Sequence, residues 1–262
     1  MQMKRTTTKM TKVPFLSEDE IEKEAELLLA EYTETSGAPI KLPIPLDEIT
    51  IYHLALRLGF ADLHRVLRIP KLRDQPDILG AIWVDTETVL IDHSLDPKKH
   101  PSMTGRYRFS VAHEIGHWWL HRILCRQGWQ PGLIVRGSNS ADGGLPLRPG
   151  KAPIEWQADF FSSCLLMPRK MIKQAWRDRF GDDYPRIPRR MDRIFVPPNV
   201  DDETVADVCS FNQRRDNEAL EHIARPFSKQ FLVSPVAMRI RLEKLGLLHR
   251  EVPRQRSFMA QQ

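Results

Sequence analysis

The chain has 262 residues, of which 41 % are hydrophobic and 28 % are charged. That length suits one full domain with a smaller addition, and the composition excludes a disordered chain and favours a globular one with a real core. No apolar run approaches the ~18 residues that a membrane-spanning helix requires. The net charge of +5 permits an acidic or nucleic-acid partner, but basic and acidic residues are interspersed, so the balance is weak evidence for either.

Cysteine use and the start of the chain both predict a soluble, cytoplasmic protein. There are three cysteines, none in a C-x-x-C pair, which argues against a disulfide framework and for a reducing compartment. Residues 1–16 are basic but lack the apolar stretch of a secretory signal, and we expect them to form a flexible tail.

Two helices are predicted in the first quarter of the chain. Ser17 and Glu20 form a capping box before an amphipathic helix whose apolar residues continue to Tyr32. Asp47 can cap a second helix, and Gly59 is its natural end.

A small sheet and two apolar helices are expected next. Residues 78–85 and 89–93 are rich in β-branched and aromatic side chains and flank a polar turn, which predicts a β-hairpin. A long helix covers about 103–123, another begins near Pro153 and ends at Pro168, and helical residues follow to about 180.

The helix at 103–123 carries the pattern H-E-x-x-H at His113, Glu114 and His117. Residues four apart lie on one face of a helix, about 6 Å apart along its axis, which suits two imidazoles that hold one zinc ion. Glu114 lies about 100° around the helix, so it would flank the metal and take a proton from zinc-bound water.

The alternative is a structural helix with two hydrogen-bonded core histidines. The other residues of this helix are apolar on nearly every side, which indicates burial, and buried imidazoles beside a carboxylate are costly unless something pairs them. A metal ion would supply that pairing. His121 would lie about 12 Å along the axis from His113, too far to share the ion, so we expect it at the surface or at a second site.

A third metal ligand is predicted in the segment "IEWQADFF". Glu155 and Asp159 are again four residues apart, on a helix that is otherwise apolar. Glu155 would bind the metal, and Asp159 would accept the free ring N–H of a ligand histidine, with His113 as the expected donor. The alternative is a solvated acidic face, which the surrounding core residues disfavour because buried carboxylates are rarely left unpaired.

Together these residues resemble the ImmA/IrrE family of zinc metallopeptidases. The resemblance covers about residues 20–180 and rests on "RFSVAHEIGHWWLH", "EWQADFFSSCLLMP" and the segments "ILGAIWVD" and "VLIDHS" before the motif. It implies zinc ligation by His113, His117 and Glu155, with Glu114 as general base. The sequence departs from the family at Gln157, where members often carry Glu. Known members cleave, or promote cleavage of, DNA-binding repressors, and the resemblance implies such a role here.

The C-terminal part predicts a helix-turn-helix-like pair, with Ser234 as the cap of the second helix. Arg239, Arg241 and Lys244 project away from its apolar face and could meet DNA phosphates. The alternative is that the pair packs on the peptidase domain or docks a protein. We favour this alternative because nearby glutamates dilute the basic face.

These observations predict an α+β protein with a zincin-like peptidase core, made of a small β-sheet and a buried active-site helix, followed by a C-terminal helical module. The expected division is a tail at 1–16, a zinc metallopeptidase domain at 17–180, a Pro- and charge-rich linker at 181–216 and the helical module at 217–262. The predicted function is zinc-dependent peptide hydrolysis, with a DNA-binding repressor or an antitoxin-like protein as substrate. The rival hypothesis is a DNA-binding transcription regulator with a sensory or relic metal site.

Overall fold

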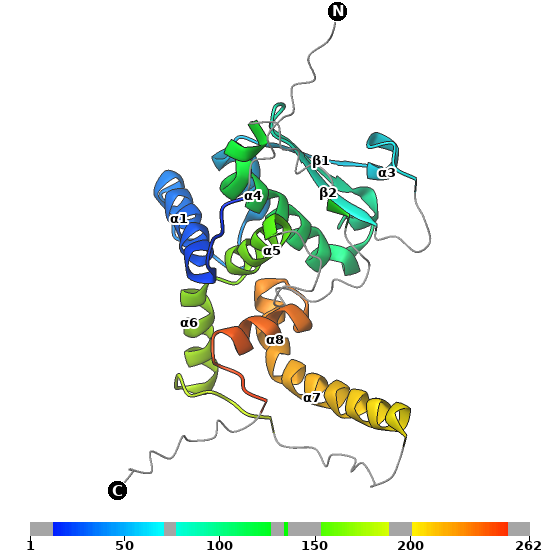
Figure 1. Ribbon diagram of the computed structural model, residues 1–262. Coiled ribbons are helices and arrows are strands. Elements are labelled where there is room, and N and C mark those ends of the chain that lie inside the picture. Colours follow the sequence, from blue (N-terminus) through cyan, green and yellow to red (C-terminus); the bar gives the residue numbers. More distant parts are fainter. Residues whose placement is uncertain (1–12, 71–76, 127–133, 136–152, 189–200, 251–262) are drawn as a thin grey trace, which may run out of the picture.

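The computed structural model describes residues 13–70, 77–126, 134–135, 153–188 and 201–250. It has the predicted α+β architecture, with a small sheet on one side of a group of packed helices (Figure 1). Residues 1–12 of the predicted tail and residues 189–200 of the predicted linker lie outside the described residues. None of the helices in the described ranges is both long and apolar enough to cross a membrane.

Helix α1 (Glu18–Ser36) begins at the predicted capping box. The Ser17 hydroxyl accepts the N–H of Glu20, and the Glu20 carboxylate accepts the N–H of Ser17 at 2.7 Å. These two bonds satisfy backbone donors that the first helical turn leaves without partners. The prediction of this helix is therefore confirmed from its first residue.

The predicted second helix is wrong beyond residue 53, and Asp47 does not cap it, because the helix already begins at Leu46. A short α2 (Leu46–Glu48) runs into a π-helix (Ile49–His53), which ends where the Leu54 N–H bonds to the Ile49 carbonyl at 2.9 Å. The chain then turns and forms strand β1 (Arg57–Ala61) instead. Parallel pairing of this segment with a neighbouring strand outweighs its local preference for helix.

The sheet has four strands in the order β1-β3-β2-β4. The predicted hairpin is confirmed, because β2 (Ile78–Trp83) and β3 (Thr88–Asp92) pair antiparallel. The remaining strands are β1, parallel to β3, and the short β4 (Ile134–Val135), antiparallel to β2. The minor elements are α3 (Leu63–Val66) and two 3₁₀ turns, η2 (His93–Leu95) and η3 (Pro101–Met103).

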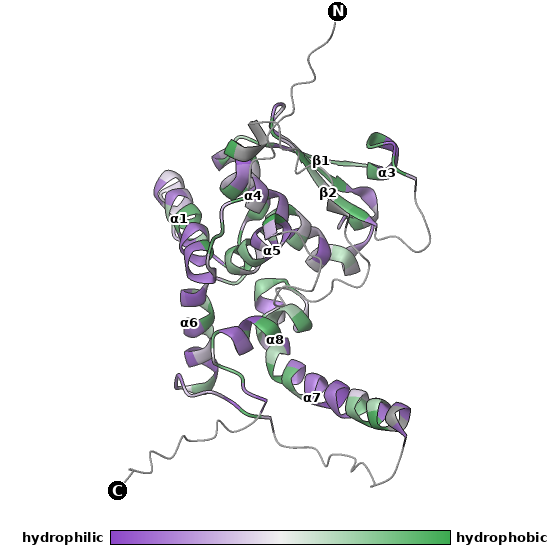
Figure 2. Ribbon diagram, in the orientation of Figure 1, coloured by the Kyte–Doolittle hydropathy of each residue, from purple (hydrophilic) through white to green (hydrophobic). Residues whose placement is uncertain are grey.

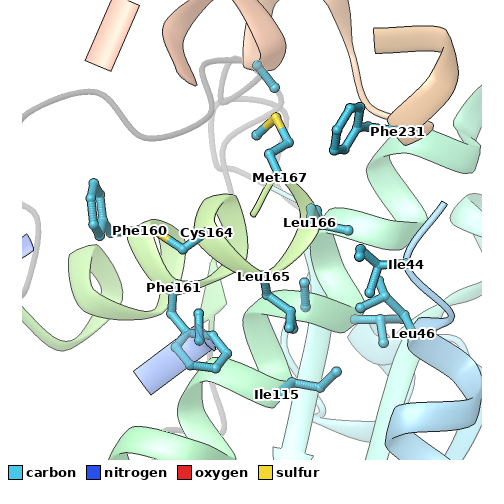
Figure 3. Packing of buried hydrophobic residues seen from close by; sticks show 14 of the residues in the cluster. Ile44, Leu46, Ile115, Phe160, Phe161, Cys164, Leu165, Leu166, Met167 and Phe231 are labelled. Carbon is cyan, nitrogen blue, oxygen red and sulfur yellow. The ribbon is translucent and has the colours of Figure 1, made fainter. Parts of the chain in front are cut away.

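Helix α4 (Thr104–Arg126) packs on β2 and β3 with one face and on α5 (Pro153–Leu166) with another. A Cβ at Gly116 would lie 3.2 Å from the backbone of Ala158, so glycine lets the two helices approach closely. In Figure 3, Phe161 and Leu165 of α5 point toward Ile115 of α4. Helix α1 covers another side of α5, so the residues of the H-E-x-x-H motif lie in the interior.

Three further helices complete the chain: α6 (Arg169–Phe180), α7 (Asp202–Phe231) and α8 (Pro235–Lys244). As predicted, the Ser234 hydroxyl caps α8 by accepting the Ala237 N–H at 3.0 Å. Helix α7 begins well inside the predicted linker 181–216. Its first half projects from the body, while buried residues near its end join the same hydrophobic core as α1 and α4 (Figures 1 and 2).

A buried ionic cluster ties α8 to the start of the chain. The carboxylate of Glu22, on α1, is 6 % exposed and accepts hydrogen bonds from Arg169 and Arg241. Arg241 also donates to the Met167 carbonyl at 3.1 Å. Burial by itself would raise the pKa of Glu22, but the hydrogen bonds and positive charges of the two arginines lower it.

We predict that Arg241→Leu will lower the free energy of unfolding by about 3 kcal/mol, because it removes one partner of a buried charge. Since the pKa of Glu22 is lowered on folding, this stabilisation is present above the ordinary value of 4.5 and is lost as the pH falls below it. Urea unfolding at pH 7 measures the loss. The control is Arg177→Leu, at an exposed pair with Asp183, which should cost no more than ~1 kcal/mol. Equal losses in both variants would contradict the prediction.

Candidate metal centre

Helix α4 holds His113, Glu114 and His117 in the interior, where they are 2 %, 1 % and 0 % exposed. The two histidines are one helical turn apart, and their Nε2 atoms lie 3.0 Å from each other. The structure therefore brings the first two predicted ligands together with their Nε2 atoms facing the same point.

The third predicted ligand reaches this point from α5. The carboxylate oxygens of Glu155 lie 3.4 Å from His113 Nε2 and 3.6 Å from His117 Nε2. Burial would raise the pKa of Glu155, but its interactions with the two histidines outweigh burial and hold the pKa well below its usual range. One donor atom from each of the three residues lies within 4.8 Å of the others, so the group could hold a metal ion.

Asp159 orients the first histidine. Its Oδ1 atom lies 2.7 Å from Nδ1 of His113, as the prediction of this pair requires. A carboxylate can only accept here, so Nδ1 carries the proton and the lone pair of a neutral ring is on Nε2. Asp159 thus directs the basic nitrogen of His113 toward His117 and Glu155.

Glu114 lies beside the sheet rather than among the three donor residues. A Cβ built on Gly80, in β2, would meet Glu114 Oε1 at 2.6 Å. Glycine therefore leaves the space that the Glu114 carboxylate occupies between α4 and β2. The sequence contains Gly80 inside a predicted strand, but only the packing of α4 on β2 shows why a side chain is absent there.

Of the two positions expected for His121, at the surface or at a second site, the surface position is wrong. Its ring is 1 % exposed, and its Nδ1 lies 3.2 Å from Nδ1 of His117. The other nitrogen, Nε2, lies 2.8 Å from Oε1 of Gln157. Burial, followed by repulsion from His117, lowers the pKa of His121 to about 4, so the ring is neutral at pH 7. His121 is consequently a partner of a candidate ligand, as its i, i+4 spacing from His117 allows.

Two other polar residues of α4 face away from the candidate metal centre. The Tyr107 hydroxyl donates to Asp47 at 2.9 Å, and Arg108 donates to the Ile44 carbonyl at 2.8 Å. Tyr107 thus holds α2 against α4, and Arg108 holds the residue Ile44 that precedes α2. Neither is therefore assigned to the chemistry of the site.

The comparison with known families agrees with this geometry. Residues 98–197 match the Peptidase M78 family, described as the IrrE N-terminal-like domain. This match supports the sequence resemblance to the ImmA/IrrE family of metallopeptidases for this part of the chain. No curated protein matches the chain.

We predict that Gly80→Ala will destabilise the protein by about 1–3 kcal/mol, because the new methyl group overpacks against Glu114. The loss should shrink when Glu114 is also replaced by Ala, since the clashing carboxylate is then gone. Chemical unfolding of the single and double variants measures this coupling. Gly59→Ala is the matched control in the same sheet, where a Cβ meets only a Leu90 methyl at 3.3 Å. A loss that is independent of Glu114 would show that the contact does not matter.

Proposed function

We propose that the protein is a zinc-dependent metalloendopeptidase, with His113, His117 and Glu155 as ligands and Glu114 as general base. The observation that carries this proposal is the convergence of donor atoms from two buried histidines and the partly exposed Glu155 at one point, with the buried Glu114 on the same helix as the histidines. The peptidase family of residues 98–197 supports the same reaction class.

The donor atoms fit a zinc ion. Zinc bonds of ~2.0–2.1 Å in a tetrahedron place neighbouring ligand atoms about 3.3 Å apart. The two Nε2 atoms are 3.0 Å apart, and each lies a similar distance from one oxygen of Glu155: Oε2 is 3.4 Å from His113, and Oε1 is 3.6 Å from His117. Three protein ligands also leave one position for water or substrate, which is the pattern of catalytic rather than structural zinc.

The surrounding residues have separate roles in the proposed reaction. A bound zinc ion supplies a Lewis acid that polarises the scissile carbonyl and lowers the pKa of its water. Glu114 would act as the general base, accepting a proton at its carboxylate and returning it to the leaving amine, which requires a carboxylate that is not itself a metal ligand. Asp159 keeps His113 in the tautomer that presents Nε2, so the ligand does not have to reorganise.

We propose a DNA-binding repressor, or an antitoxin-like protein, as the substrate, and a cytoplasmic site of action. The resemblance to ImmA/IrrE proteins supports the substrate class. Cys164 and Cys209 are free thiols, which is consistent with a reducing compartment.

A transcription regulator that grips DNA with its C-terminal helices is the second candidate, and the charges of α8 disfavour it. Arg239 pairs with Glu221 and Glu243, so its charge is balanced locally. Arg241 and Lys244 bind glutamates of α1. Basic side chains that are already paired contribute little to phosphate binding.

We predict that Glu114→Gln will keep zinc and fold but lower proteolysis at least ~10²-fold, because glutamine retains the shape and cannot act as a base. Metal analysis and cleavage of the candidate repressor, identified as the protein encoded beside this one, measure the two effects. Near-normal cleavage by this variant would remove Glu114 from the mechanism. Specific DNA binding by the intact protein, with no cleavage of the repressor, would favour the regulator.

We also expect about one zinc per chain, as a single three-ligand site requires. His113→Ala and Glu155→Ala should each lose most of this metal, because two remaining ligands hold zinc weakly. Elemental analysis of protein purified without chelators measures the content. Retention of full zinc by Glu155→Ala would show that the third ligand is a different residue.

A further inference from the structure

A chain of hydrogen bonds connects the segment before α1 to the second candidate ligand. The side-chain amide of Gln157 donates to the Pro14 carbonyl at 2.8 Å. Its Oε1 lies 2.8 Å from Nε2 of His121, whose Nδ1 lies 3.2 Å from Nδ1 of His117. We call these four groups the Pro14–His117 relay.

The chemistry of its ends sets the direction of every bond in the relay. A carbonyl can only accept, so Pro14 requires the NH₂ group of Gln157 on its side and leaves the amide oxygen facing His121. That oxygen can only accept, so the ring tautomer of His121 that fits this contact has its proton on Nε2.

The same reasoning continues to the metal centre. With its proton on Nε2, His121 offers a lone pair at Nδ1, which accepts the Nδ1–H of His117. The lone pair of His117 is then on Nε2, the atom that faces His113 and Glu155. The backbone at Pro14 thus determines the tautomer of a side chain three groups away.

We propose that His121 and Gln157 are positioning residues that hold His117 in the tautomer able to bind metal. This inference rests on the proposed zinc site. It also explains why the two histidines have different partners. Asp159 is an acidic partner of His113, whereas the relay orients His117 through an imidazole, an amide and a backbone carbonyl and adds no second carboxylate beside Glu155. A second carboxylate would make a bound zinc ion less electrophilic and therefore a weaker Lewis acid for the scissile carbonyl.

The tautomers can be observed directly by two-bond ¹H–¹⁵N correlation spectra of the ¹⁵N-labelled full chain, after its metal content has been measured. The expected result is an Nε2–H signal for His121. An Nδ1–H signal for His121 would overturn the proposal. This readout does not depend on bound zinc, so a protein without metal would contradict the zinc site while still testing the relay.

Zinc affinity, measured by competition with a chromophoric chelator, tests the effect of the relay. His121→Leu and Gln157→Leu should each weaken zinc binding about 10–100-fold, as loss of a partner of a metal-binding histidine does. Gln157→Glu keeps an acceptor facing His121, so this variant should retain near-native zinc affinity. A purely structural role would not distinguish the leucine from the glutamate variant.

His222→Leu is the matched control, because His222 is exposed on α7 and far in sequence from the relay. It should bind zinc like the parent protein. Thermal unfolding of the zinc-free variants shows that each one is folded before its affinity is compared. Parent-like zinc affinity in both folded leucine variants would overturn the proposal.

Discussion

The close packing of α4 against α5 is the constraint on which the candidate site depends. Gly116 allows this approach, because any larger side chain would meet the backbone of Ala158. At this distance the carboxylates of Glu155 and Asp159 reach the two histidines of α4 from the neighbouring helix. A wider separation would leave buried imidazoles and carboxylates without partners, which is among the costliest arrangements in a protein interior.

The same principle organises the polar contacts around the two candidate ligand histidines. Every candidate ligand histidine has a hydrogen-bond partner on the nitrogen that faces away from the metal centre, and these partners differ in charge. Asp159 is an anion held four residues from Glu155 on one helix face. His121 is neutral and depends on Gln157, which in turn depends on the backbone of Pro14. The segment before α1 therefore belongs to the surroundings of the site.

The C-terminal helices α7 and α8 also pack against the helices that carry the candidate site. Phe227 and Phe231 of α7 and Leu242 of α8 lie in the same hydrophobic cluster as the residues of α4 and α5. Figure 3 shows Phe231 on the side of α5 where Met167 lies. The pairing of Arg241 with Glu22 adds an ionic contact across this boundary. Removing these helices would expose apolar surface of the shared core, so they contribute to the stability of the whole described structure.

Local patterns in the sequence were sufficient wherever the interacting groups are neighbours along one element. The capping box, the hairpin, the spacing of His113 and His117 and the placement of Glu155 and Asp159 on one helix face follow from helix and strand periodicity. Tertiary structure decided the features that require contact between distant segments. Strand β1 replaced part of a predicted helix because β3 lies beside it, and His121 is buried because α5 covers it. Gly80 and Pro14 acquire their roles only through groups 34 and 143 positions away, Glu114 and Gln157, because periodicity specifies the face of an element and not what packs against it.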